Sequence, residues 1–444
     1  MTPSTKCTHF PLVQDLPEDI LHEIFSHLHP TLEKSISLRE PPLSLTRVSR
    51  SWRKVAMDVS SLWTNLVLDR SLGQLDPYGI ISMWLTNSKT RLLNVVVQTA
   101  SWQARVNGEE CLRLLVNNFH RFQSFSGRLD LRLEQVIFSH LRYGQIEAPN
   151  LVEFSIFFQE RLPIPISHLQ DCISAPALAV LKLEHCALTE LVVSALPHIT
   201  HLILDPELWS QASADLAFLP KCRNLTTLEM GIHGNMYTPR TQPGERLRFN
   251  MLHTLLLHLN RGYNPRLLFD SLSAPNLRRL EVVQKQVMMN DCLTPTLRTS
   301  TLYNFMHGSS TNVQYLSLTA IVIDDPIRLR HLLWGLSNLT HLALRQCLIH
   351  DPIIIELTPS RMKANFRRGI SCPRLTHVDF RGSSFTPGLF IPMIQNRFVW
   401  NGFGIDYLRV VDVRCNPPRY FDPVETVSLQ QLMRESMGRL EILF

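Results

Sequence analysis

The sequence predicts an α/β protein in which a small helical domain precedes a solenoid, a curved parallel sheet with helices on its outer side. Three observations lead to this prediction. A phrase of the form apolar-x-x-apolar-x-apolar recurs along the chain, most often about 26 residues apart, which suits one strand and one return helix per repeat. Helical patterns lie between several of these phrases. Two amphipathic segments of different texture precede the first phrase.

The first element is an amphipathic helix within residues 16–28. Pro17 suits the first helical turn, where its missing N–H costs nothing, and two acidic residues follow it at the positive end of the helix dipole. The apolar residues that share one face, at i, i+3, i+4 and i+7, are Leu21, Ile24, Phe25 and Leu28. The pattern therefore predicts a helix with one apolar side.

The second element is a helix within residues 43–63. Its apolar face contains Leu45, Val48, Trp52, Val55 and Val59. Its opposite side is basic and contains Arg47, Arg50, Arg53 and Lys54. Two short helices bury too little surface to fold alone, so they need either the following domain or another protein against their apolar sides.

Together the two segments resemble an F-box. The pattern of that family is Leu-Pro, a helix rich in Ile and Leu that ends in Phe and Leu, a Val-x-x-x-Trp-Arg helix, and Leu-Trp. The matching residues are Leu16, Pro17, Ile20, Leu21, Ile24, Phe25, Leu28, Val48, Trp52, Arg53, Leu62 and Trp63. The sequence departs from the pattern at Ser49, where the family usually has Cys, and in the long connection 29–42, where two prolines cannot continue a helix. The alternative interpretation is an ordinary helical cap on the domain that follows.

The recurring phrase predicts the strands of the solenoid. It begins at Leu151, Leu178, Ile199, Leu225, Leu252, Leu277, Val313, Leu339, Leu375 and Leu408. The array resembles the degenerate leucine-rich repeats of F-box proteins, in which each unit supplies a short strand and a return helix. Return helices are predicted within 166–174, 266–273 and 327–337, and long intervals predict inserted loops at 284–311 and 351–373.

The remaining segments complete the predicted domain organisation. Strands at 92–98 and 122–133, with a helix at 111–119 between them, are interpreted as atypical first repeats. Residues 429–444 are predicted to supply the closing helix and the last strand. The predicted parts are an N-terminal tail at 1–14, an F-box-like helical domain at 15–70, capping repeats at 71–148 and a leucine-rich-repeat solenoid at 149–444.

Alternation along the strands predicts three columns of outward side chains on the concave face. The third column has arginine in three consecutive repeats, and neighbouring strands lie about 4.8 Å apart, so these cations need an acidic neutraliser. The candidate target-binding residues are Tyr315, His341, Arg345, His377, Arg381 and Arg414, suited to an acidic or phosphorylated segment of a partner. In the alternative, Asp379 and Asp412 pair with these arginines in a solvated lattice. A second candidate surface is the inserted loops, with Arg361, Lys363, Arg367 and Arg368.

Composition narrows the class of protein. The formal charge of +6 is dispersed, which argues against nucleic acid, and no stretch has the length and hydrophobicity of a signal peptide or a membrane span. Nine cysteines without a C-x-x-C pair fit free thiols in the cytoplasm or nucleus. No motif indicates an enzyme or a cofactor, and Cys172, His185 and Cys186 match no zinc pattern, so no metal is expected. Asp324 and Asp325 precede a proline and are predicted helix caps.

The resemblance implies a function that involves no chemistry in this chain. An F-box protein of this kind is a substrate-receptor subunit of an SCF-type E3 ubiquitin ligase in ubiquitin-dependent protein degradation. Its F-box binds a Skp-family adaptor, and through it a cullin-RING ligase, while its repeats bind a target protein, here unidentified. The alternative is a leucine-rich-repeat interaction scaffold without ubiquitin-ligase coupling. A receptor should leave Leu16, Pro17, Ile20, Ile24 and Leu28 exposed in the isolated protein.

Overall fold

The structure, a computed structural model of the 444-residue chain, describes most of the predicted elements. The described residues are 16–28, 36–69, 76–98, 108–129, 146–158, 173–184, 196–204, 216–232, 246–259, 265–284, 297–309, 312–359, 371–399, 405–414 and 421–443. The chain forms two compact units, residues 1–198 and 199–444. Both units are α/β, as predicted. The finer division into four parts stays a prediction.

The first unit begins with the predicted helical segments. They are α1 (Glu18–Ser26), η2 (Leu45–Arg47), α2 (Arg50–Asp58) and η3 (Ser60–Trp63). The helix predicted within 43–63 is confirmed as α2, but Leu45 and Val48, which were assigned to its apolar face, lie before it. The reason is that Ser49 has an extended backbone and its Oγ accepts a hydrogen bond of 3.1 Å from the Trp52 N–H. Ser49 is therefore the N-cap of α2 and separates this helix from η2. Of the connection 29–42, only residues 36–42 lie within the described ranges.

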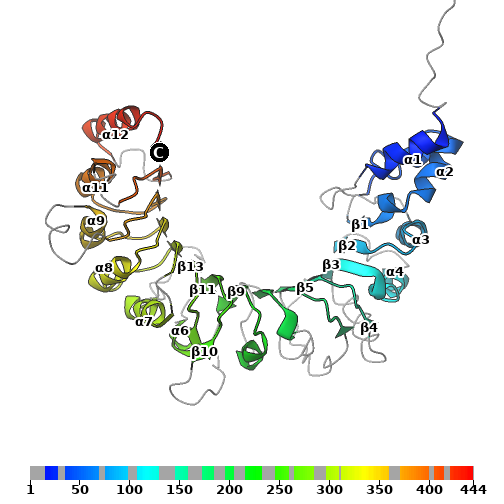
Figure 1. The fold of residues 1–444 in the computed structure, drawn as a ribbon, viewed down its shortest axis with the longest axis horizontal. Coiled ribbons are helices and arrows are strands. Elements are labelled where there is room, and N and C mark those ends of the chain that lie inside the picture. The colour runs from blue at the N-terminus through cyan, green and yellow to red at the C-terminus, as the bar shows by residue number, and fades with distance from the viewer. Residues whose placement is uncertain are drawn as a thin grey trace, which may run out of the picture. The chain divides into compact units, whose positions relative to one another are not determined.

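A parallel sheet follows in the first unit (Figure 1). Its strands, in spatial order, are β1 (Asn65–Leu68), β2 (Leu93–Gln98), β3 (Phe122–Leu129), β5 (Glu153–Phe158) and β7 (Val180–Glu184). The helices between them are α3 (Pro77–Asn87), α4 (Gly108–Val116) and η6 (Phe119–Arg121), and η7 (Leu196–His198) follows β7. A short parallel pair consists of β4 (Ile146–Glu147) and β6 (Ile173–Ser174). The strands predicted at 92–98 and 122–133 and the helix between them are confirmed within the described residues. The helix predicted at 166–174 is wrong at its end, which is β6, and the rest of that range lies outside the described residues.

The second unit is a longer parallel sheet. Its strands, in order, are β8 (His201–Leu204), β9 (Thr227–Ile232), β11 (Thr254–Leu259), β13 (Arg279–Gln284), β14 (Tyr315–Thr319), β15 (His341–Arg345), β16 (His377–Asp379), β17 (Val410–Asp412) and β18 (Glu441–Leu443). A second short pair joins β10 (Leu247–Arg248) to β12 (Leu272–Ser273). Every predicted repeat phrase is thus confirmed as a strand.

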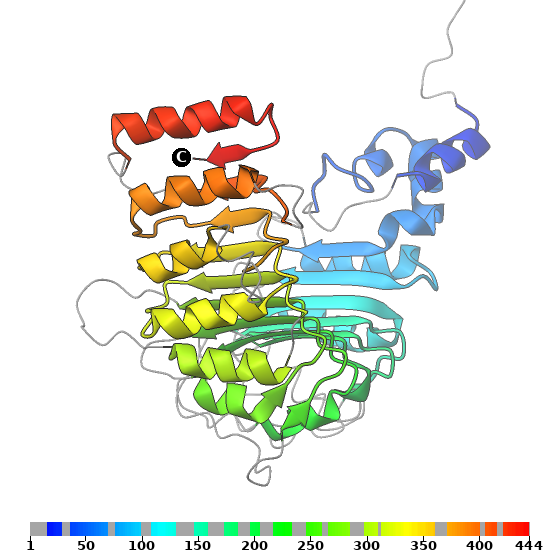
Figure 2. The ribbon, with the colours of Figure 1, turned by 60° about the vertical axis from the view of Figure 1, so that its left-hand side comes forward.

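Helices cover one face of this second sheet (Figures 1 and 2). They are η8 (Leu216–Lys221), α6 (Arg266–Ser271), α7 (Thr299–Ser309), α8 (Pro326–Gly335), α9 (Asp351–Leu357), α11 (Pro387–Val399) and α12 (Pro423–Glu435). The return helix predicted at 266–273 is confirmed as α6 and is wrong at its end, which is β12. The return helix predicted at 327–337 and the closing helix are confirmed as α8 and α12. The core lies between the layers, where Leu316, Leu342 and Val378 are paired in register and buried. Full burial of each such side chain stabilises the fold by about 1.5–3 kcal/mol.

The two predicted inserted loops are wrong in part, because each contains a return helix. In α7 the buried residues Leu302, Phe305 and Met306 follow helical spacing, and in α9 the buried residues are Ile353, Ile354 and Leu357. The four basic residues predicted at 361–368 lie outside the described residues.

The two predicted capping aspartates are confirmed at neighbouring helices. The Asp325 side chain accepts from the Arg328 N–H at 3.0 Å and begins α8. Asp324 accepts from the Thr299 N–H at 2.8 Å, so it caps the start of α7 instead. Since adjacent carboxylates serve two adjacent helices, this pair fixes the register of α7 against α8.

The described cysteines are buried free thiols, as predicted for them. They are Cys111, Cys222, Cys347 and Cys372. Burial raises the pKa of the Cys111 thiol to about 12 and that of the Cys347 thiol to about 11. These thiols are therefore protonated and unreactive at neutral pH. Cys172, His185 and Cys186 lie outside the described residues.

Candidate functional site

The helices of the F-box-like segment are held together by an aromatic core. Leu21 and Phe25 of α1 are fully buried, and the Phe25 ring meets the Trp52 ring edge to face at a centroid distance of 5.1 Å. The Trp63 indole N–H donates to the Ala56 carbonyl at 2.7 Å, and its ring contacts Trp84 of α3 at 4.8 Å. These contacts pack α1 and α2 against each other and against α3 of the first unit, so the segment has a buried aromatic core.

A second set of apolar side chains on α1 points outward instead. Ile20 is 46% exposed and Ile24, one turn later, is 44% exposed. Pro17 is exposed as well, while Leu16 and Leu28 are half-buried. Large apolar side chains at i and i+4 that remain in solvent form the kind of stripe by which a helix binds a partner.

The other predicted adaptor-binding residues occupy different places. Val48 is 45% exposed, and Trp52 is half-buried, with an indole nitrogen that has no hydrogen-bond partner among the described residues. Leu21 and Phe25 were predicted to bind the adaptor together with Ile20 and Ile24. Because both side chains are buried, they pack inside the segment and are not available to a partner. An ion pair between Lys54 and Glu18, with a distance of 2.7 Å, ties α2 to the start of α1.

The predicted outward columns of the second unit are confirmed by the strand pairing. On the open face, away from the helices, β14 carries Tyr315, Ser317 and Thr319, and β15 carries His341, Ala343 and Arg345 in direct register. The same face of the next repeats carries His377, Asp379, Arg381, Val410, Asp412 and Arg414. We call this set, with Arg279 and Glu281 of β13, the open-face cluster.

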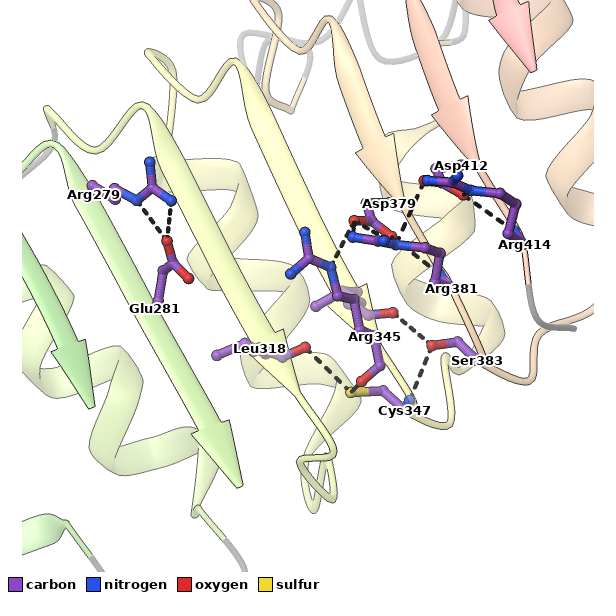
Figure 3. Close-up of polar contacts among 11 residues, drawn as sticks. Arg279, Glu281, Leu318, Arg345, Cys347, Asp379, Arg381, Ser383, Asp412 and Arg414 are labelled. Atoms are coloured by element: carbon purple, nitrogen blue, oxygen red, sulfur yellow. Dashed lines mark hydrogen bonds and ion pairs between the residues drawn. The ribbon is translucent and has the colours of Figure 1, made fainter. Parts of the chain in front are cut away.

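Arginines and aspartates alternate in the open-face cluster (Figure 3). Arg345 Nε donates to Asp379 at 2.6 Å, and Arg381 Nη2 donates to the same carboxylate at 2.8 Å. Arg381 also lies 3.5 Å from Asp412, which accepts from Arg414 Nη2 at 2.7 Å. Burial opposes ionisation of Asp379, but hydrogen bonds from Arg381 and Arg345 outweigh it and hold its pKa below the ordinary range. The structure therefore contains the lattice that was the alternative interpretation of the sequence. The aspartates neutralise the arginine column.

Aromatic rings form a parallel row beside this lattice. The Arg279 guanidinium lies 4.2 Å from the Tyr315 ring centroid, Tyr315 and His341 are 5.7 Å apart, and His341 and His377 stack at 4.0 Å. The Thr340 hydroxyl lies within hydrogen-bond distance of both the Gln314 carbonyl, at 2.9 Å, and His341 Nδ1, at 2.8 Å, which fixes the orientation of the His341 ring.

Burial lowers the pKa of both stacked imidazoles. At His341, the neighbouring His377 and Arg279 lower it further, and at His377 the charge of Arg409 does so. Both rings are consequently neutral at pH 7. The sequence analysis placed these rings in one column but did not include Arg279, whose guanidinium packs on the Tyr315 ring at the end of the row. Arg279 could have been found, because it is the residue before Tyr315 in the same column.

The pKa shifts predict a pH dependence of stability in the second unit. Between the lowered folded value and the ordinary value of 6.5, the unfolded chain binds more protons at these histidines, so the free energy of unfolding should fall as pH drops below about 6.5 and level off below the folded pKa. His377→Gln should flatten this slope, because glutamine keeps a polar group without titrating. Urea denaturation at pH 7.5, 6.5 and 5.5 measures it. An equal slope in wild type and variant would contradict the assignment.

Other kinds of site are not found in the part of the chain that the structure describes. No group of three or more His, Cys, Asp or Glu side chains there could hold a metal ion. None of the helices in these ranges combines the length and the apolar character that crossing a membrane requires.

The fold and the two surfaces define a class of protein. A helical segment with an outward apolar stripe precedes parallel sheets built from leucine-rich repeats. Residues 13–69 match the F-box-like family model. The chain thus combines a segment that matches the F-box-like family model with parallel sheets whose strands come from a recurring leucine-rich phrase.

Solved structures with similarity to this chain include an internalin and a mouse protein complex. The internalin InlF of Listeria monocytogenes is 12% identical with a TM-score of 0.40, over 76% of this chain and 88% of that chain. The mouse RP105/MD-1 complex is 14% identical with a TM-score of 0.39, over 81% of this chain and 56% of that chain. No curated protein matches the sequence.

Proposed function

We propose that the chain is a substrate receptor of an SCF-type E3 ubiquitin ligase. The observation that carries the proposal is the division of α1 into two apolar sides within a segment that matches the F-box-like family. Leu21 and Phe25 are buried, while Ile20 and Ile24 remain in solvent. The two exposed isoleucines are one helical turn apart, so together they form a continuous apolar stripe on the outer side of α1.

In this proposal α1 docks on a Skp-family adaptor, which links the chain to a cullin-RING ligase. Ile20 and Ile24 enter an apolar groove, with Pro17 and the half-buried Leu16 and Leu28 around them. Burying each isoleucine contributes about 1.5–3 kcal/mol, which is typical of the few residues that dominate an interface. Val48 and Trp52 lie on the neighbouring helical turns and complete the proposed contact.

The open-face cluster is the proposed surface for the target protein. Tyr315, His341 and His377 offer flat rings, and Arg345, Arg381 and Arg414 offer hydrogen-bond donors beside them. Stacking surfaces and charged groups held by a rigid sheet suit recognition of an extended segment of a partner. The target would be modified by partner enzymes, and no chemistry is assigned to this chain.

Capture from cells tests the proposal against the scaffold alternative. A tagged full-length chain expressed in cells should recover a Skp-family adaptor and a cullin, identified by mass spectrometry, and the variant Ile20→Asp, Ile24→Asp should recover neither. The matched control is Ile327→Asp, since Ile327 is 55% exposed on α8 and belongs to neither proposed surface. A chain that captures other proteins but no adaptor and no cullin would support the scaffold instead.

A further inference from the structure

The start of α2 carries three exposed arginines, which we call the arginine patch. Arg47 is the last residue of η2, Arg50 is the first residue of α2, and Arg53 lies one helical turn later. The guanidinium groups of Arg47 and Arg50 make no hydrogen bond or ion pair among the described residues. Arg53 Nε donates to the Thr46 carbonyl at 2.8 Å, which supplies an acceptor but no full negative charge.

The carboxylates of the F-box-like segment do not neutralise the arginine patch. Three of them already have partners, because Glu18 pairs with Lys54 at 2.7 Å, Glu23 with His27 at 3.0 Å and Asp58 with Lys89 at 2.6 Å. Apart from histidines, the charged residues described between 16 and 63 are Glu18, Asp19, Glu23, Glu40, Asp58, Arg39, Arg47, Arg50, Arg53 and Lys54. None of the five acidic residues forms an ion pair with the patch in the described part of the chain.

The arginine patch also lies at the unfavourable end of its helix. The N-terminal end of α2 has a partial positive charge, and the first turn contains no acidic residue, whereas α1 begins with Glu18 and Asp19. Ser49 caps α2 with a hydrogen bond to the Trp52 N–H but adds no negative charge. Cations in this position destabilise the isolated chain, and a local feature that opposes the fold is expected where a surface serves function.

An apolar residue of the proposed docking surface lies within the arginine patch. Val48 is 45% exposed, and Arg47 and Arg50 flank it in the chain. The helix α2 packs on α1 through Trp52 and Phe25, and Figure 1 shows the two helices side by side. A partner that covers Val48 therefore comes within reach of both guanidinium groups.

We propose that the arginine patch binds acidic side chains of the adaptor, which lie beside the apolar groove that receives Ile20 and Ile24. This inference rests on the proposed function, in which α1 docks on a Skp-family adaptor. Carboxylates of the adaptor accept hydrogen bonds from the guanidinium groups and also face the positive end of α2. Charges at the rim of an interface attract the partner over a distance, so they mainly set the association rate, whereas the apolar residues hold the complex together.

Association kinetics of the full-length chain on an immobilised, purified Skp-family adaptor test the proposal. In surface plasmon resonance, the association rate should fall at least about tenfold between about 50 mM and 500 mM salt. The variant Arg47→Glu, Arg50→Glu should associate at least about tenfold more slowly than wild type at the lower salt concentration and lose most of this salt dependence. Its dissociation rate should change by less than about threefold.

The matched control makes the same change of charge in the second unit. Arg223 and Arg374 are exposed, and their side chains make no hydrogen bond or ion pair among the described residues. The variant Arg223→Glu, Arg374→Glu should therefore keep the wild-type association rate within about twofold, because these residues lie outside the proposed contact. An equal loss of rate in this control would show a general effect of net charge and would overturn the proposal.

Thermal unfolding separates binding from folding. Arg50→Glu should raise the melting temperature, because glutamate suits the first turn of a helix, while the same variant associates more slowly. A structural role of Arg50 predicts a lower melting temperature instead. A salt-independent association rate, an unchanged rate in Arg47→Glu, Arg50→Glu, or slower association together with a lower melting temperature in Arg50→Glu would each overturn the proposal. A wild-type chain that binds the adaptor at a salt-independent rate leaves the receptor function standing, whereas a wild-type chain that does not bind the adaptor refutes both.

Discussion

Ile24→Asp is expected to weaken binding of a Skp-family adaptor by at least about a hundredfold, which corresponds to about 2.7 kcal/mol. Ile24 is 44% exposed on α1, and in the proposed complex it is buried in an apolar groove. Aspartate there loses the apolar contact and places a charge where no partner group neutralises it. Isothermal titration calorimetry with purified full-length chain and adaptor measures the change.

The fold should survive this substitution, because an exposed position tolerates a polar residue within about 0.5 kcal/mol. Leu21→Asp provides the contrast, since Leu21 is fully buried on the other side of the same helix and its charge would unfold the segment. Ile327→Asp on α8 is the control for an exposed isoleucine elsewhere. If Ile24→Asp and Ile327→Asp bind the adaptor equally well, α1 is not the docking helix.

Arg397→Leu is expected to destabilise the second unit by about 3–5 kcal/mol. Arg397 of α11 is fully buried, and its guanidinium donates to the carbonyls of Leu357, Cys372 and Ser371 at 2.8, 3.1 and 2.9 Å. Burial lowers its pKa to about 10, so it remains protonated at pH 7. Leucine removes the guanidinium donors of three buried carbonyls, and among the described residues only the Cys372 carbonyl still accepts another hydrogen bond, from the Leu375 N–H at 3.1 Å. The Leu357 carbonyl, at the C-terminal end of α9, loses its donor.

Chemical denaturation monitored by far-UV circular dichroism measures this loss. Arg397→Lys keeps the charge but cannot direct three donors in the plane of a guanidinium, so it should recover only part of the stability. Arg328→Leu on the surface of α8 should change the free energy of unfolding by less than about 0.5 kcal/mol. A loss of under about 1 kcal/mol for Arg397→Leu would contradict the role of Arg397 as the joint between α9 and α11.

The strands and the outward columns could be predicted because strand alternation fixes which face each side chain occupies. Once the repeat phrases were aligned, His341 and His377 had to be neighbours, and the structure pairs them. The same reasoning could not choose between a free arginine column and a lattice, because that depends on how Arg345 and Arg381 turn toward Asp379. The repeat pattern fixes the face on which a side chain lies, but it does not determine the rotamer of a long side chain such as arginine.

The failures have local physical causes. Ser49 caps α2 through a side-chain hydrogen bond, which hydrophobic spacing over 43–63 does not register. The inward and outward apolar residues of α1 could not be separated, because Ile20, Leu21, Ile24 and Phe25 cover about half of the helix and only the packing of Phe25 on Trp52 selects the inner side. The helix α3 went unpredicted because it is apolar on most sides.

Arg397 was missed for a different reason, and a signal for it existed. It follows Phe390, Met393 and Ile394 at helical spacing, so it lies on the buried face of α11. An arginine in that position indicates a buried hydrogen-bonding role, which its three carbonyl acceptors confirm. A basic residue on the apolar face of a return helix is therefore worth noting in degenerate repeats of this kind.

The most direct test of the receptor function is the stoichiometry of the two purified proteins in solution. Full-length chain and a Skp-family adaptor, mixed at about 10 μM each, are separated by size-exclusion chromatography with light scattering. The exposed Ile20 and Ile24 predict a one-to-one complex that elutes as a single species. Separate elution of a folded chain and a folded adaptor at this concentration would contradict the proposed function.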